Sequence, residues 1–142
     1  MSAALVPELY VTDLPVSLAL YQGILGFEIV YGRPEEKFAY IKSGSVEMML
    51  EEPIERTWLT GNLERPFGRG VNFQIQTSDI HALYERCHLS DAKIFLPLET
   101  KTYARRDDTV SQTQFIVQDP DGYLIRLAQI TPPTDDKIRD RP

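Results

Sequence analysis

The sequence has a single cysteine and no long apolar run, and both shortages narrow the class of protein. Cys87 has no partner for an internal disulfide, which fits a reducing compartment. No apolar stretch approaches the ~18 to 20 residues needed to span a bilayer, and no basic segment followed by an apolar one marks a signal peptide. We therefore expect a cytoplasmic protein that does not cross a membrane.

Positive charge and histidine are also scarce. The 142 residues include 15 Lys and Arg against 21 Asp and Glu, so the net charge is −6, and the pI is near 4.9. Nucleic-acid binding depends on clustered basic side chains, so we expect no nucleic-acid partner. The field of an acidic protein favours cationic small molecules instead. His81 and His88 fall in or near one predicted helix and form no zinc signature.

What the first half does contain is a strand, a helix and three further strands. The segment ELYVT (8–12) alternates like a half-buried strand, and Asp13 then offers an N-cap with Pro15 in the first helical turn. Gly26 is the predicted stop of this helix. The three strands are predicted at FEIVYG, KFAYIKS and VEMMLEE, residues 27–32, 37–43 and 46–52.

The second half repeats this order. VNFQIQT (71–77) reads as a strand, Asp79 as a cap, and an apolar stripe that includes Cys87 as a helix, which makes Cys87 a core residue. Strands follow at 93–99, 112–117 and 123–130, the last two joined by a DPDG turn. We expect one domain with modules at about 4–52 and 71–130, a linker or lid at 53–70 and a tail at 131–142.

The paired order, the segment VTDLPVSLALYQGILGFEIV (11–30) and the closing DPDGYLIRL (119–127) resemble the vicinal oxygen chelate superfamily. That superfamily holds glyoxalase I, bleomycin-resistance proteins and extradiol dioxygenases, and the resemblance covers about residues 4–130. It implies an α+β fold in which two βαβββ modules form a cupped eight-stranded sheet, the glyoxalase/bleomycin-resistance-like fold. The concave face of such a sheet is the ligand cleft, and a homodimer, often with exchanged elements, is the usual assembly.

In the metal-dependent members, a His or carboxylate on the first strand and a Glu on the last strand of each module bind the metal. The resemblance places these positions at Val6, Met49, Asn72 and Arg126, none of which is a good ligand for a divalent cation. We therefore expect no metal and no other cofactor. Two alternatives remain for Arg126: it is solvated or paired at a rim, or the strand register slips by one and turns its neighbours to the cleft.

Strand parity describes the cleft face without the resemblance, because alternate side chains point to opposite faces. Residues such as Leu9, Leu50 and Ile75 should pack on the helices, which leaves carboxylates, amides, a phenol and one guanidinium on the other face. This face is alternatively the wet side of an antiparallel sheet, and Phe38 a core residue. The predicted ligand-binding residues are Glu8, Tyr10, Phe38, Glu47, Met49, Glu51, Trp58, Asn72, Gln74, Tyr103 and Arg126.

Two functions of different classes follow. The first, which we favour, is a metal-independent binding protein of the bleomycin-resistance type with no catalytic residue. It would act in antibiotic resistance by sequestering a cationic, aromatic, bleomycin-like molecule in an acidic cleft. The second is a metal-dependent glyoxalase-, isomerase- or dioxygenase-like enzyme that uses non-standard ligands such as Glu8 or Glu47.

Overall fold

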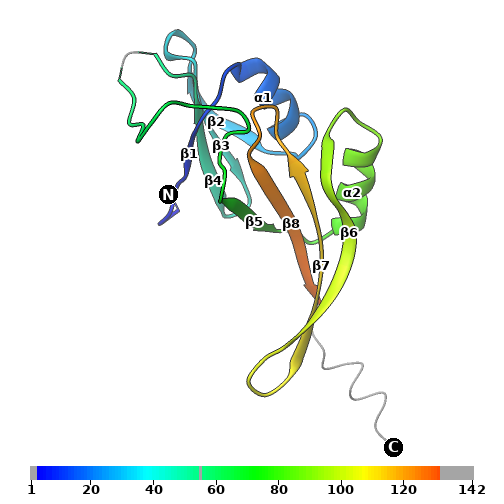
Figure 1. Ribbon diagram of the computed structural model, residues 1–142. Helices are drawn as coiled ribbons and strands as arrows, with labels where there is room; N and C mark the ends of the chain where they lie inside the picture. Colours follow the sequence, from blue (N-terminus) through cyan, green and yellow to red (C-terminus); the bar gives the residue numbers. More distant parts are fainter. Residues whose placement is uncertain (1–2, 55, 132–142) are drawn as a thin grey trace, which may run out of the picture. The chain divides into compact units, whose positions relative to one another are not determined.

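The computed structural model describes residues 3–54 and 56–131, and Figure 1 labels their helices and strands. The predicted tail, apart from Thr131, lies outside the described residues. The described residues divide into two compact units, the first made of 3–54, 56–70 and 119–123, and the second of 71–118 and 124–131. None of the helices in the described part of the chain is long and apolar enough to cross a membrane.

The first unit is a four-stranded mixed sheet with one helix. Its elements are β1 (Glu8–Tyr10), α1 (Leu14–Tyr21), β2 (Glu28–Arg33), the 3₁₀ turn η1 (Pro34–Glu36), β3 (Phe38–Ser43) and β4 (Val46–Glu51). The strand order is β1-β4-β3-β2, with β1 parallel to β4 and the other pairs antiparallel. The Asp13 carboxylate caps α1 by accepting a hydrogen bond from the Val16 N–H.

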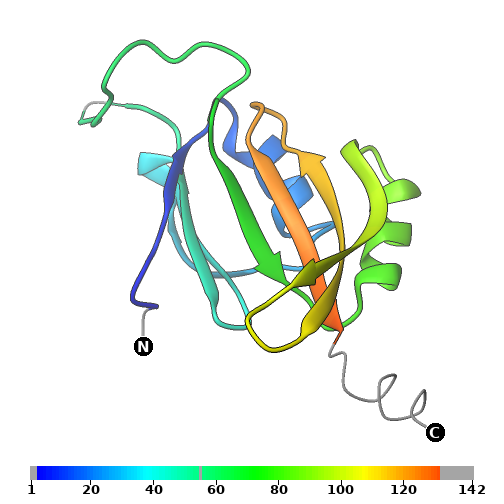
Figure 2. The same ribbon diagram turned by 60° about the horizontal axis from the view of Figure 1, so that its bottom comes forward.

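The second unit repeats this plan. Its elements are β5 (Asn72–Gln76), α2 (Ile80–His88), β6 (Lys93–Ala104), β7 (Thr109–Gln118) and β8 (Leu124–Thr131), and the strand order is β5-β8-β7-β6. Figure 2 shows α2 packed along one side of the β6–β7–β8 sheet. The Asp79 side chain caps α2 at the Ala82 N–H, as the sequence predicted. Both modules therefore have the predicted order of elements, in an α+β fold of two βαβββ modules.

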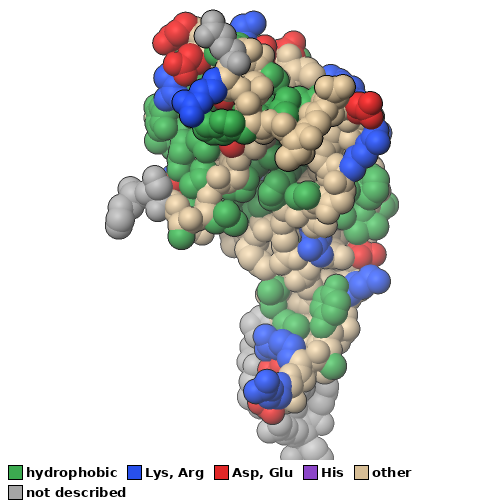
Figure 3. Space-filling model, turned by 60° about the vertical axis from the view of Figure 1, so that its left-hand side comes forward, with side chains coloured by type: hydrophobic (Ala, Val, Ile, Leu, Met, Phe, Trp, Pro, Cys, Tyr) green, Lys and Arg blue, Asp and Glu red, His purple; other side chains and the backbone are tan. Residues whose placement is uncertain are grey.

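Several element ends differ from the prediction, most clearly those of α1 and β6. Helix α1 ends at Tyr21 rather than near Gly26. The backbone N–H groups of residues 22–25 donate in pairs to the carbonyls of Leu18 and Leu20, so the regular helical hydrogen-bond pattern stops. Strand β6 continues to Ala104, five residues beyond the predicted end at 99, since residues 100–104 pair with 109–113 of β7. Figure 3 shows charged side chains gathered at the tip of this long hairpin, where Arg105 and Asp108 form an ion pair.

The DPDG turn, which joins β7 to β8, belongs to the first unit. One oxygen of the buried Asp119 carboxylate accepts the backbone N–H groups of Asp121, Gly122 and Tyr123, each at 2.9 Å. The other oxygen accepts the Tyr21 hydroxyl at 2.8 Å. The turn is thus held in shape by its own first residue, and that residue is bonded to α1.

Further bonds attach the same turn to the first unit. The Asp121 carboxylate accepts the hydroxyl of Thr12 at 2.6 Å and a guanidinium N–H of Arg65 at 3.1 Å. The Tyr123 hydroxyl donates to the Tyr10 carbonyl at 2.9 Å, and the Phe67 N–H donates to the Asp121 carbonyl at 2.8 Å. We call residues 119–123 the closing turn.

Candidate functional site

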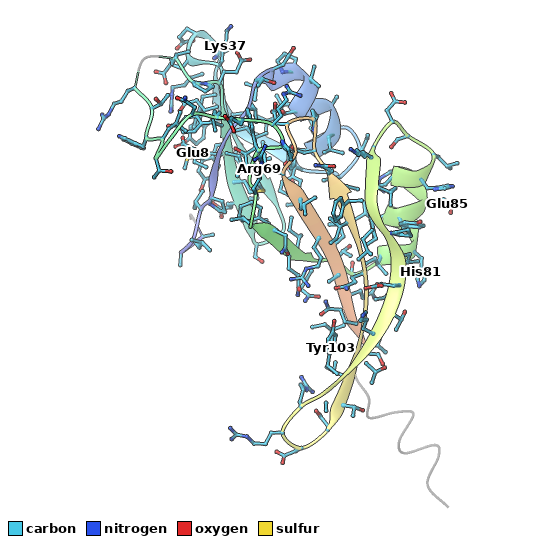
Figure 4. The ribbon with its side chains drawn as sticks, viewed as in Figure 1. Glu8, Lys37, Arg69, His81, Glu85 and Tyr103 are labelled. Atoms are coloured by element: carbon cyan, nitrogen blue, oxygen red, sulfur yellow. The ribbon has the colours of Figure 1, made fainter. Side chains whose placement is uncertain are left out.

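Six of the predicted ligand-binding residues share one face of the first sheet. The register sets Glu8 beside Met49 and Tyr10 beside Glu51, and antiparallel pairing sets Phe38 beside Glu51. Neighbours in register point to the same side, so these side chains and that of Glu47 lie opposite the buried Leu9, Met48 and Leu50. Glu8 extends from β1 in Figure 4. We call this surface the acidic face.

Three aromatic rings pack together on the acidic face, but they differ in exposure. Tyr31 is about half exposed, whereas Phe38 and Tyr40 are buried, so Phe38 is a core residue as one of the two alternatives predicted. The Tyr31 and Tyr40 rings stack with their centroids 5.2 Å apart, and the Tyr31 and Phe38 centroids are 5.9 Å apart. The Arg33 guanidinium carbon lies 4.1 Å from the Phe38 centroid, which is cation–π geometry. The sequence analysis missed Tyr31 and Arg33, although the alternation of β2 places both beside β3 residues of this face.

The pKa values of two carboxylates on the acidic face, Glu47 and Glu51, are shifted in opposite directions. The hydrogen bond from the Tyr40 hydroxyl lowers the pKa of Glu47, so its charge is stabilised by a neighbour that is already in place. Burial, followed by the like charges of Glu8 and Glu36, raises the pKa of Glu51. A bound cation would offset the burial and the like charges that disfavour the ionised form of Glu51. Glu8 and Glu51 therefore form the cation-attracting part of the face.

Trp58 and Tyr103, two further predicted ligand-binding residues, are not among the six residues of the acidic face. The Trp58 backbone N–H donates to the Tyr10 hydroxyl at 3.0 Å, but its side chain is 70% exposed with the Arg56 guanidinium 5.0 Å from its centroid. Tyr103 lies on β6 beside Val110 in the second unit. Val110 and Ile116, the partner of Arg126, are six positions apart on β7, so roughly 20 Å lies between Tyr103 and Arg126 along the sheet.

The second sheet has a polar face built mainly from amides. Arg126 lies beside Gln74 in the parallel β5–β8 pair, and Asn72 lies beside Leu124. Ile125 and Leu127 are buried while Arg126 is half-buried, so the one-residue slip does not occur. The sequence analysis missed the buried Gln112 and Gln114, although their alternation with Phe115 and Val117 in QTQFIV is the signal for such a face.

The family's metal positions do not fit a metal in either unit. In the first module, Val6 and Met49 offer no hard or charged donor for a metal. In the second module, Asn72 is a weak ligand and Arg126 is a permanent cation that would repel a metal ion. Within residues 3–54 and 56–131, no group of three or more His, Cys, Asp or Glu side chains is arranged to hold a metal ion. The alternative ligand Glu47 accepts the Tyr40 hydroxyl. The residues at the family's four metal positions therefore do not suit a divalent cation.

A groove of about 880 Å³ also lies in the first unit, where the start of α1 meets β2 and β3. Its lining is mainly apolar and includes Leu14, Leu18, Ile29 and Ala39. The charged group at its edge, Glu52, accepts the Leu14 N–H at 2.8 Å and lies 3.5 Å from the Lys37 ammonium. The groove thus offers a binding volume, with its edge carboxylate already engaged within the unit.

Two βαβββ modules, each with its first strand parallel to its last, define a two-module α+β protein. A family model described as "Glyoxalase/Bleomycin resistance protein/Dioxygenase superfamily" matches residues 4–127. The chain belongs to this superfamily. No curated protein matches it at a significant level.

The chain is also similar to several solved structures. A glyoxalase/bleomycin resistance protein/dioxygenase superfamily member from Vibrio splendidus 12B01 is 44% identical over 86% of this chain and 94% of its own, with a TM-score of 0.41. TioX from Micromonospora sp. ML1 is 20% identical, with 91% and 98% covered and a TM-score of 0.68. A lactoylglutathione lyase from Agrobacterium tumefaciens is 20% identical, with 91% and 94% covered and a TM-score of 0.58. The last two are similar in fold.

Proposed function

We propose that this protein is a metal-independent binding protein that sequesters a cationic, aromatic small molecule on its acidic face. The observation that carries the proposal is the Glu8 and Glu51 carboxylates on the same face as the half-exposed Tyr31 ring, which packs on the buried Phe38 and Tyr40 rings. The carboxylates attract positive charge, and the exposed Tyr31 ring offers a stacking surface for an aromatic or cationic group. Membership of a superfamily that includes bleomycin-resistance proteins supports a bleomycin-like ligand and a role in antibiotic resistance.

The expected affinity follows from the two kinds of contact. A carboxylate near a cation contributes on the order of 1 kcal/mol at a partly wet site, and an aromatic contact contributes a similar amount. Two carboxylates and the exposed Tyr31 ring give about 3 kcal/mol together. Burial of roughly 200 Å² of apolar surface at ~25 cal/mol per Å² supplies the further ~5 kcal/mol that micromolar affinity requires. We further propose that the protein acts as a homodimer in the cytoplasm, since homodimers are usual in the superfamily.

Calorimetric titration with metal-free bleomycin tests the proposal. We expect saturable binding that weakens as the pH falls through the pKa of Glu51, because the neutral carboxyl no longer attracts a cation. That pKa lies above its ordinary value, so the loss begins at a higher pH than for an unperturbed glutamate. Glu51→Gln should weaken binding about fivefold and flatten this pH dependence.

The matched control is Glu35→Gln, which removes the same charge from an exposed position on η1. It should leave the affinity within about twofold, because exposed distant charges are screened. Equal losses in both variants would show that net charge rather than the acidic face attracts the ligand. Absence of any binding heat or thermal shift would refute the bleomycin-like ligand itself.

A further inference from the structure

The polar face of the second sheet holds hydrogen-bond donors whose partners are not all within the protein. Antiparallel pairing sets Ile116 beside Arg126, and parallel pairing sets Gln74 on the other side. Ala128 follows Arg126 on the same face of β8 and is buried. Arg126 therefore lies between an exposed carboxamide and apolar side chains, on a sheet that is complete within this unit.

The amides of this face form an ordered row. Gln114 donates from its Nε2 to the Glu99 carboxylate at 2.8 Å, and Gln112 donates from its Nε2 to the Gln114 carbonyl oxygen at 2.9 Å. Gln112 Nε2 also lies 3.5 Å from the carbonyl oxygen of Gln74. An ionised Glu99 carboxylate can only accept hydrogen bonds, so the NH₂ group of Gln114 must point toward it. This leaves the side-chain oxygen of Gln114 to accept from Gln112, whose NH₂ group also faces the side-chain oxygen of Gln74. The Gln74 amide group, a double donor, is left for a partner beyond the row.

Arg126 supplies the strongest unmet donor in the described part of the chain. Its Nε is shielded from solvent and has no hydrogen-bond partner among the described residues. A shielded donor on a permanently charged group is costly to leave unpaired, and an oxyanion satisfies it with two parallel bonds. The guanidinium edge that contains Nε is one of the two edges that bind a carboxylate in this way.

We propose that Arg126 and Gln74 bind the carboxylate of a small organic acid, whose apolar body packs on the half-buried Ile116. Two features favour a monocarboxylate over phosphate. The Glu99 carboxylate on the same face repels a dianion more strongly than a monoanion. The neighbour of Arg126 on β7, Ile116, is apolar, so it contacts a hydrocarbon body better than a fully hydrated ion. The site lies in the second unit and does not rest on the proposed cation site.

The experiment is a titration of the full-length ¹⁵N-labelled protein with sodium benzoate, followed by NMR at the Arg126 side-chain Nε–H. We expect a saturable downfield shift of this signal, because its proton gains an anionic acceptor. Arg126→Lys should weaken binding by about tenfold or more, since an ammonium cannot form the two parallel bonds. Arg106→Gln, which removes a charge from the exposed hairpin tip, should leave the affinity unchanged.

A second pair of variants tests the position of the site. Gln74→Glu places a carboxylate beside Arg126, so it should occupy the guanidinium and abolish benzoate binding. Gln76→Glu adds the same charge two residues along the same face, beside Ala128, and should retain binding. Melting temperatures of both variants report whether each folds; if Gln74→Glu does not fold, the Arg126→Lys result decides.

Three results would overturn the proposal. The first is an Nε–H signal that stays unchanged up to the solubility limit of benzoate. The second is an equal loss of binding in Gln74→Glu and Gln76→Glu, which would indicate general charge repulsion. The third is inorganic phosphate producing the same shift at the same concentration, which would exclude an organic acid as the preferred ligand.

Discussion

Gly122 shows most clearly why the closing turn needs its particular residues. Its φ of +116° lies in a region that side-chain-bearing residues rarely adopt. A Cβ built on it would lie 2.5 Å from the Cβ of Pro66 and 2.7 Å from the Phe67 nitrogen. The backbone of the closing turn therefore lies directly against residues 66 and 67, and only a hydrogen in place of a side chain allows this approach.

Gly122→Ala should lower the free energy of unfolding by about 3 kcal/mol, because backbone strain and overpacking act together. Gly44→Ala is the matched control. Gly44 also has a positive φ of +59°, but nothing lies within 4 Å of its added Cβ, so a loss of about 1 kcal/mol from strain alone is expected. Urea unfolding of both variants measures the difference, and equal losses would mean that the Pro66 contact yields without cost.

At the residue scale, the sequence predicts local chemistry and misses distant partners. The Asp-Pro-Asp-Gly pattern predicted a tight turn, and alternation correctly assigned Ile125 and Leu127 to the core. Nothing in the local pattern showed that both aspartates are buried, because their partners Tyr21 and Thr12 lie 98 and 109 residues away. Such contacts depend on the tertiary fold, which periodicity does not describe.

At the scale of elements, helix α2 confirms the prediction made from its apolar stripe. Ile80, Leu83 and Cys87 are all buried on its inner side, and the Tyr84 ring meets the Phe115 ring edge-on at 4.9 Å. Burial raises the pKa of the Cys87 thiol to about 11, so the reactive thiolate is scarce at neutral pH. Cys87 is a packing residue, as the stripe predicted.

The thiol therefore reports on opening of α2. Reaction with a disulfide reagent at pH 7.5 should be at least about a hundredfold slower than for an unfolded chain, since it needs both exposure and deprotonation. Leu83→Ala, which removes packing beneath the helix, should speed the reaction. Measurement of thiol release with and without denaturant tests this, and a native rate equal to the denatured rate would contradict the burial of Cys87.

The lengths of the elements were harder to predict than their order. The segment TKTYA at the end of β6 has no apolar alternation, so its pattern does not predict that the strand continues through it. The extension is instead stabilised by hydrogen bonds between hydroxyl groups across the hairpin. The hydroxyls of Thr100 and Thr113 lie 2.9 Å apart, and those of Thr102 and Ser111 lie 3.0 Å apart. Cross-strand pairs of this kind become visible only once the register is known.

At the scale of the whole molecule, the first unit is not continuous in sequence. It takes the closing turn from a position after β7, and Thr12, Tyr21 and Arg65 depend on that turn for hydrogen bonds. Removing the turn leaves these groups without their partners, and each loss of this kind costs about 1 kcal/mol or more. The boundary between the modules in sequence is therefore not the boundary of the first folded unit.

A fragment of residues 1–70 should accordingly lack a cooperative thermal transition. Joining DPDGY to Gly70 through a short Gly/Ser linker should restore the transition, because the Phe67 N–H lies only 2.8 Å from the Asp121 carbonyl. The matched control carries APAGY in place of DPDGY and should not be restored. Circular dichroism on heating distinguishes the three chains, and a sharp transition in the plain fragment would contradict the dependence.

The position of the closing turn also sets an order of events during translation. The first unit receives its last residues only after the ribosome has added all of 71–118, which include β5, α2, β6 and β7. The second sheet receives its strand β8 immediately afterwards. A nascent chain that stops before residue 119 therefore carries two incomplete units, and a short stretch of synthesis from 119 to 131 completes both.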